Sequence, residues 1–282
     1  MNIHKKAAVL IEALPYIKKY YGKIVVIKAG GNALGKKDEM MEDIVLIKHI
    51  GINPVVVHGA GPEIDKELEK EKIESKFIDG LRYTDKKIIG LVKKAFGNVS
   101  REMIDKISSH NAKAVNLNGC IKAKQKHEKY GLVGEVTGID KKKILDAIGR
   151  GFIPVISPLG VGNGKDYNKE YNINADTAAS HIAVALNAEK LTIVTNVDGI
   201  VIRGKLQPHV DFSAAMSEIK SGIISKGMIP KVKACMHAVK NKCPKAHLIN
   251  GLIPHSLLLE IFTDEGIGTE IIYHNGCGGL AN

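Results

Sequence analysis

The chain has 282 residues, of which 44% are hydrophobic and 25% are charged; this composition is typical of a folded domain and excludes a disordered or fibrous protein. The formal net charge is +11, but the lysines are scattered and no aromatic residues interleave with them, so a nucleic-acid-binding surface is not predicted. Four cysteines without CxxC spacing and no membrane-length apolar run favour a cytoplasmic protein without disulfides, secretory leader or membrane segment.

Residues 3–22 precede the first predicted strand and have the pattern of an amphipathic helix. One apolar stripe recurs at spacings of three and four, through Ala7, Leu10, Leu14, Ile17 and Tyr21. Pro15 lies inside the pattern, so we expect it to kink the helix or split it in two.

From residue 24 onward, short apolar runs alternate with helical patterns, which predicts an α/β fold with a mainly parallel sheet covered by helices on both faces. The predicted strands are 24–28, 53–57, 113–117, 153–157, 190–195 and 245–249. The predicted helices are 38–50, 62–72, 86–96, 100–110, 140–149, 175–187, 213–222, 228–242 and 254–262. Segments 118–138 and 160–172 lack helical periodicity and are expected to form hairpins.

The stretch "IVVIKAGGNAL" (24–34) is a strand that is apolar on both faces and ends in Lys28. The end of such a strand is where open α/β sheets bind ligands. Gly30 and Gly31 allow a turn with positive φ and bring backbone N–H groups close to whatever the lysine faces. A solvated lysine before an ordinary turn is the alternative interpretation.

The stretch "VVVHGAGP" (55–62) repeats this device, with Gly59, Ala60 and Gly61 followed by a proline suited to a first helical turn. A glycine turn at a helix N-terminus is a ready anion site, although for this stretch alone an ordinary tight turn between strand and helix is the stronger interpretation. Neither the Walker A pattern nor GxGxxG occurs, so an ordinary P-loop ATPase or NAD enzyme is excluded.

Two later stretches add polar groups at helix N-termini. "YNINADTAASHIAVAL" (171–186) places Asn172, Asn174 and Asp176 at the start of a helix, more than an N-cap alone requires. "KGMIPKVKA" (226–234) places Lys231 early in another helix, where a lone lysine is usually exposed to solvent.

These candidates lack an obvious general base, and the sequence has no serine elbow and no HExxH. A carboxylate needs no base because it is already an anion near neutral pH. Phosphoryl transfer from ATP to a carboxylate requires mainly positioning and charge neutralisation, which lysines and glycine turns can supply.

At this point the sequence resembles a known family. The segments "VVIKAGGNAL", "VVVHGAGP", "DGLRYTD", "GLVGEVTGID", "GFIPVISPLGVG", "YNINADTAA", "KLTIVTNVDGI", "GMIPKVKACMHAV" and "PHSLLLEIFTDEGIGTEII" occur in the order found in acetylglutamate kinases of the amino acid kinase family. The resemblance covers nearly the whole chain. It implies an open three-layer αβα sandwich that phosphorylates N-acetyl-L-glutamate with ATP and Mg²⁺, the metal being held mainly by nucleotide phosphates.

The resemblance also implies roles for individual residues. Lys28 and Lys231 would stabilise the transition state, and Asp176 would orient them. Arg82 would grip the acceptor α-carboxylate, Gly30, Gly31, Gly59, Ala60 and Gly61 would hold phosphoryl and acceptor groups, and Asn172 and Asn174 would lie near the acetamido end. For the nucleotide it implies Thr195, Asn196, Gly199, Gly227 and Met228. It divides the chain into an oligomerisation helix (1–22), an acceptor lobe (23–185) and an ATP lobe (186–282).

Some positions depart from the family pattern. Ala29 replaces an aromatic residue, Ala60 replaces the middle of three glycines, Asn196 replaces an aspartate, and "NGCIKAKQ" (118–125) differs from the usual "SGKDG"-like segment. Two alternatives therefore stay open: a kinase for an aminoadipate group, carried on an acidic protein for example, and an arginine-binding regulator with little catalysis.

The N-terminal helix adds a further expectation. Arginine-inhibited members of the family interlace such helices to join three dimers into a hexamer. The resemblance therefore implies a homohexamer with L-arginine as inhibitor, bound near His255, Glu265 and Gly268.

Overall fold

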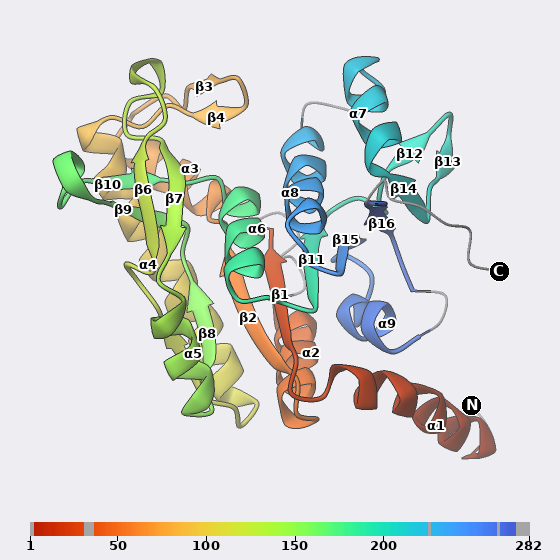
Figure 1. The fold of residues 1–282 in the computed structure, drawn as a ribbon. Helices are drawn as coiled ribbons and strands as arrows, with labels where there is room; N and C mark the ends of the chain where they lie inside the picture. The colour runs from red at the N-terminus through yellow and green to blue at the C-terminus, as the bar shows by residue number, and fades with distance from the viewer. Residues whose placement is uncertain (1–2, 31–36, 225–226, 264–265, 275–282) are drawn as a thin grey trace.

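An eight-stranded sheet forms the centre of the protein in the computed structural model, which describes residues 3–30, 37–224, 227–263 and 266–274 (Figure 1). The strand order is β14-β16-β15-β11-β1-β2-β8-β5, and only the β15–β16 pair is antiparallel. The bounds are β1 Ile24–Ala29, β2 Asn53–His58, β5 Ala114–Asn116, β8 Ile153–Ile156, β11 Lys190–Thr195, β14 His209–Asp211, β15 Lys245–Asn250 and β16 Thr269–Ile272. All six predicted strands are confirmed, whereas β14 and β16 were not predicted.

The central strands are apolar on both faces because helices cover both faces of the sheet. Val26 and Val57 point into one core, with α6 (Ala175–Ala185) and α8 (Ile229–Lys240). Val25, Ile27 and Val56 point into the other core, with α2 (Lys37–His49), α3 (Gly61–Lys70), α4 (Lys86–Ser109) and α9 (Ser256–Phe262). The three layers predicted from the sequence are therefore present (Figure 1).

The helix prediction is wrong at one place. The segments 86–96 and 100–110 form one helix, α4, rather than two. Its buried residues Val92, Phe96, Val99 and Met103 continue at helical spacing past Gly97, so packing on the sheet outweighs the weak helix propensity of this glycine. The remaining helices are α5 (Lys141–Gly149) and α7 (Phe212–Lys220), both close to their predicted positions.

The two predicted hairpins are confirmed, and they associate in one four-stranded sheet. Strands β6 (Ile121–Gln125) and β7 (Gly134–Ile139) pair antiparallel, as do β9 (Leu159–Gly162) and β10 (Glu170–Asn172). The order is β10-β9-β6-β7. Two short hairpins were not predicted: β3 (Phe77–Ile78) with β4 (Leu81–Arg82), and β12 (Val201–Ile202) with β13 (Lys205–Leu206).

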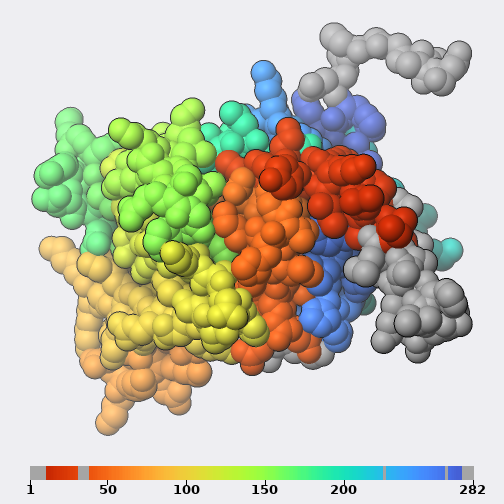
Figure 2. All heavy atoms as spheres, turned by 90° about the horizontal axis from the view of Figure 1, so that it is seen from below, coloured from red at the N-terminus to blue at the C-terminus, as the bar shows by residue number. Residues whose placement is uncertain are grey.

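Helix α1 (Ile3–Tyr20) lies on the outside of the protein, at the end of the sheet where β1 begins (Figures 1 and 2). It is one helix with Pro15 inside it, so of the two expected outcomes, a kink or a split, the split does not occur. Tyr20 is buried and Tyr16 packs against the core, whereas Leu14 and Tyr21 of the predicted stripe are exposed. Ile17 of the stripe is half-buried, and the side chains of Ala7 and Leu10 lie outside the described part. In the described part, no helix could span a membrane.

Candidate active site

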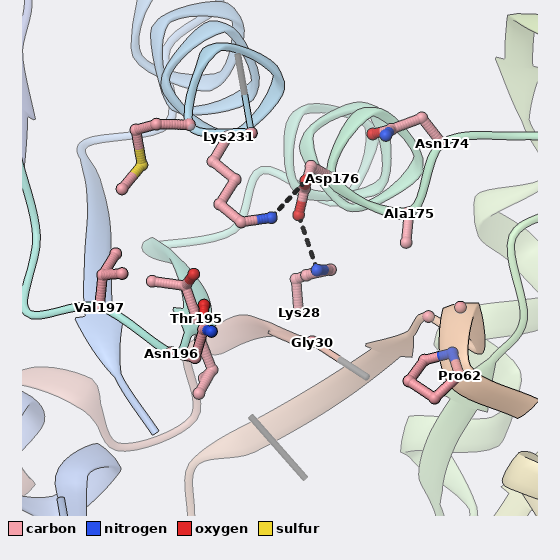
Figure 3. A pocket seen from close by; sticks show the side chains of 15 residues that line it. Lys28, Gly30, Pro62, Asn174, Ala175, Asp176, Thr195, Asn196, Val197 and Lys231 are labelled. Atoms are coloured by element: carbon pink, nitrogen blue, oxygen red, sulfur yellow. Dashed lines mark hydrogen bonds and ion pairs between the residues drawn. The ribbon is translucent and has the colours of Figure 1, made fainter. Parts of the chain in front are cut away.

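The ends of β1, β2 and β11 open into a cavity of about 450 Å³, which we call the central cavity (Figure 3). Lys28 of β1 is level with Val57 of β2 and Ile193 of β11 in these parallel pairs, so the turns after all three strands meet at one edge of the sheet. The lining residues are Lys28, Gly30, Gly59, Gly61, Pro62, Asn174, Ala175, Asp176, Val194, Thr195, Asn196, Val197, Gly227, Met228 and Lys231. This is the position at which open parallel sheets bind ligands.

Asp176 bridges the two predicted lysines in this cavity (Figure 3). Its Oδ1 is 2.9 Å from Nζ of Lys28, and its Oδ2 accepts a hydrogen bond of 3.1 Å from Nζ of Lys231. Burial would raise the pKa of Asp176, but the charges of Lys28 and Lys231 outweigh it and hold that pKa below its usual value. Burial lowers the pKa of Lys28, against the opposing effect of Asp176.

The first turns of α6 and α8 position Asp176 and Lys231 at the cavity. Asn174 is the N-cap of α6, where its Oδ1 accepts a 3.0 Å bond from Thr177 N, so the capping interpretation holds for Asn174. Asp176 is left free to face the cavity from the first turn. Lys231 lies in the first turn of α8 and is less buried than Lys28, with a side chain 20% exposed.

The glycine turn after β2 leads directly into α3. Ala60 has φ −139°, an ordinary value for a side-chain-bearing residue, so the alanine is not strained. The helix has no side-chain cap at this end. The N–H group of Gly59 donates to Ala29 O and Pro62 has no N–H, so the N–H groups of Ala60 and Gly61 are the ones in this turn that can bind an anion.

A smaller cavity of about 180 Å³, which we call the Arg82 cavity, adjoins the central cavity. The two cavities share the lining residues Gly59, Gly61, Asn174 and Ala175. Arg82 and Asn172 line it, together with Ala60. The guanidinium of Arg82 contacts Asp65 at 2.7 Å, donates to Ser75 and stacks over the Phe77 ring at 4.8 Å. Asn172 donates a 3.1 Å bond to Thr84.

The predicted nucleotide residues are brought together with one exception. Thr195, Asn196, Gly227 and Met228 line the central cavity, whereas Gly199 does not. Gly199 has φ +146°, and a Cβ there would lie 2.5 Å from Oγ1 of Thr269, so backbone geometry explains this glycine. Gly31 lies outside the described residues.

A third cavity, of about 620 Å³, lies between α1 and the β15–β16 region; we call it the α1 cavity. Gly268, one of the predicted arginine contacts, lines it. His255, another of them, does not line it, and its Nδ1 lies 2.7 Å from Asp43. Glu265 is outside the described residues.

Sequence reasoning missed the buried charges of the α1 cavity. Lys190 Nζ contacts Glu260 Oε1 at 2.5 Å, and His247 Nε2 lies 3.0 Å from the same oxygen. Burial lowers the pKa of Lys190 and reduces that of His247 to about 2. The signal was a single charge within an apolar run, as in "LLLEIF", because a buried charge requires a partner.

The described residues include no group of three or more His, Cys, Asp or Glu side chains able to hold a metal ion. Both oxygens of Asp176 already face lysines. Among the described residues, this site therefore offers no set of side chains for a divalent cation.

The Amino acid kinase family profile matches residues 23–250. The chain belongs to this family. Its curated relatives include the acetylglutamate kinases of Desulforamulus reducens (44% identical, 95% of this chain and 98% of the relative) and Thermoanaerobacter pseudethanolicus (46%, 94% and 93%). The acetylglutamate kinase of Methanococcus vannielii is 43% identical over 96% of this chain and 99% of its own.

Two solved structures place this family member among its structural neighbours. The N-acetylglutamate synthase of Neisseria gonorrhoeae, complexed with coenzyme A and N-acetyl-glutamate, has TM-score 0.87 and 26% identity over 95% of this chain, which spans 64% of that one. A Giardia carbamate kinase has TM-score 0.69 and 17% identity over 90% of this chain and 99% of its own, a likeness of fold alone.

Proposed function

We propose that this family member phosphorylates the side-chain carboxylate of N-acetyl-L-glutamate with MgATP, a step of arginine biosynthesis. The observation that carries the proposal is the Lys28–Asp176–Lys231 bridge in a cavity that continues into the Arg82 cavity. The 43–46% identity to acetylglutamate kinases supports the acceptor.

The two cavities suggest where each substrate binds. Residues of both lobes, 23–185 and 186–282, line the central cavity. The described residues that line the Arg82 cavity all lie between Gly59 and Ala175, within the first lobe. The acceptor therefore belongs to lobe 23–185, with Arg82 and Asn172 at its polar ends, and ATP belongs against lobe 186–282. Thr195, Asn196, Gly227 and Met228 are the nucleotide contacts in this scheme.

The chemistry follows from the charges. The acceptor carboxylate attacks the γ-phosphorus, the bond to the ADP oxygen breaks, and ADP leaves with the electron pair. Lys28 and Lys231 face the transferring group from β1 and α8, and they neutralise charge on its oxygens and on the leaving group. Asp176 holds both ammonium groups in place. The N–H groups of the glycine turn bind the remaining oxygens.

An ATP-dependent hydroxamate assay tests this function, because hydroxylamine traps an acyl phosphate. We expect product with N-acetyl-L-glutamate and Mg²⁺, and at least tenfold less with glutamate, aspartate or N-acetyl-aminoadipate, since one misfitted group costs about 1–3 kcal/mol. EDTA should abolish turnover, because the metal accompanies the nucleotide. Preference for the aminoadipate acceptor, or no hydroxamate at all, would contradict the proposal.

We further propose that L-arginine inhibits the enzyme by binding in the α1 cavity. Arginine carries a guanidinium and a carboxylate, so its binding site must supply both negatively and positively charged side chains. The α1 cavity is lined by the carboxylates of Asp198 and Glu270 and by the ammonium groups of Lys19 and Lys245. Exposed Ile11 and Leu14 on α1, with Tyr21 directly after it, provide the apolar surface for pairing with a second subunit's helix, in a hexamer built from three dimers.

Deleting residues 1–20 is the test of this regulation. We expect the truncated chain to be a dimer with near-normal activity but at least a tenfold higher arginine concentration for half-inhibition, because Tyr16, Lys19 and Tyr20 line the cavity. Light scattering and arginine titrations of both chains provide the measurement. A full-length dimer that is indifferent to millimolar arginine would disprove the regulation and leave the kinase proposal intact.

A further inference from the structure

His58 is a buried histidine beside the active-site glycine turn, and the mechanism above does not use it. It is the last residue of β2, directly before Gly59, and it is completely buried. Burial lowers the pKa of His58 to about 4, so the ring is neutral near pH 7. A neutral imidazole has one N–H donor and one acceptor nitrogen.

Ser100 of α4 decides which nitrogen carries the proton. Nε2 of His58 is 2.7 Å from Oγ of Ser100, and both side chains are fully buried. Other helical serines, such as Ser180, donate their hydroxyl to a helix carbonyl, but the hydrogen bond of Ser100 is to His58. If the Ser100 hydroxyl donates to Nε2, the proton of the ring lies on Nδ1.

Nδ1 is then a buried donor facing the turn. It has no hydrogen-bond partner among the described residues, and an unmet buried donor is costly. The backbone of Gly59 raises the pKa of His58, as a nearby carbonyl oxygen would. The imidazole ring of His58 also packs edge-on against Phe96, and this contact fixes the orientation of the imidazole ring. Phe96 itself lines the Arg82 cavity.

We propose that His58 is a positioning residue, whose Nδ1–H donates to the Gly59 carbonyl when the substrates bind and thereby aims the Ala60 N–H at the transferring phosphoryl group. In a planar trans peptide the C=O and N–H point in opposite directions, so anchoring the Gly59 carbonyl on the core side directs the Ala60 N–H to the cavity side. This inference rests on the proposed phosphoryl transfer at the turn.

Two substitutions separate the roles of the two ring nitrogens. His58→Asn keeps an amide nitrogen near the Nδ1 position, whereas His58→Gln reaches the Nε2 position and lacks a donor at Nδ1. We expect kcat within about threefold of wild type for His58→Asn and about tenfold lower for His58→Gln, with little change in KM for ATP, because one hydrogen bond is lost. Equal losses of kcat in both variants would overturn the proposal.

Ser100→Ala tests the other half of the arrangement. It should lower kcat severalfold, because without the Ser100 hydroxyl the ring proton of His58 is no longer held on Nδ1. Ser180→Ala, which also removes a buried hydroxyl, should leave kcat unchanged. Thermal unfolding of all four variants gives the structural cost. A kcat that simply follows the melting temperature would mean that His58 only supports the fold.

Tautomer-sensitive ¹⁵N NMR of histidine-labelled enzyme gives a readout independent of turnover, with the His58→Asn spectrum identifying the signal. We expect a neutral ring protonated at Nδ1, whose proton shifts downfield when a non-hydrolysable ATP analogue, Mg²⁺ and N-acetyl-L-glutamate are added together. A ring protonated at Nε2, or an unchanged signal, would refute the positioning role. Wild-type enzyme inactive in the hydroxamate assay would instead refute the proposed function.

Discussion

Lys28→Ala is expected to lower kcat by about 100-fold or more while changing KM for ATP much less, because the charge acts mainly in the transition state. Lys231→Ala should have the same kind of effect from the opposite side of Asp176. Steady-state kinetics of the two variants separate kcat from KM. A variant with wild-type kcat would remove that lysine from the mechanism.

Lys124→Ala is the matched control for these variants. Lys124 is also ion-paired, with Glu135 at 3.6 Å, but its side chain is 59% exposed and lies outside the central cavity. We expect unchanged kinetics, because an exposed pair contributes little.

The pH dependence of kcat gives a further test of Lys28 in the wild-type enzyme. Burial lowers the pKa of Lys28, so this lysine loses its proton, and kcat should decline, at a lower pH than that at which an exposed lysine loses its proton.

Asp176→Asn has the second large expected effect, on stability as well as on activity. Its carboxylate is the shared counter-charge of two lysines, with only 5% of the side chain exposed. Removing it leaves Lys28 buried without a compensating charge, which should cost about 3 kcal/mol of unfolding free energy. We also expect at least a 100-fold loss of kcat, because the lysines lose the group that orients them.

Denaturant unfolding and steady-state kinetics measure both losses. Asp38→Asn serves as the control, since Asp38 also pairs with a lysine, Lys106, but its side chain is 74% exposed. It should leave stability close to that of the wild type, because an exposed ion pair contributes little. If Asp176→Asn were as stable and active as this control, the bridge would have neither role.

The hydrophobic pattern predicted the sheet because buried parallel strands are unbroken apolar runs, and "IVVIKAGG" indicated correctly that Lys28 lies near the end of β1, where it lines the central cavity. Spacing could not pair Asp176 with Lys28, because the contact depends on β11 and β2 flanking β1, an order set by tertiary packing. Only the family resemblance supplied that pairing. The sequence could not show that Gly199 lies outside the central cavity, because the demands of backbone geometry and of ligand contact both select glycine.

Short or polar elements were the least predictable. Strands β14 and β16 are three and four residues long, and their pairing in the sheet defines them more than their sequence does. The ion pair of Lys190 with Glu260 joins two positions 70 residues apart, and a single charge within an apolar run such as "LLLEIF" does not indicate which residue is its partner. Such pairs become visible only when burial is known.

The wide sequence separation of the bridge has a consequence for how the protein is made. Lys28 is near the start of the chain, and Lys231 follows Asp176 by 55 residues. A ribosome-bound chain that has emerged only as far as α6 contains Asp176 without its second lysine. The three charges can meet only after α8 has been synthesised and docked beside α6, so catalytic competence arises late in synthesis and partly made chains cannot consume ATP by this route.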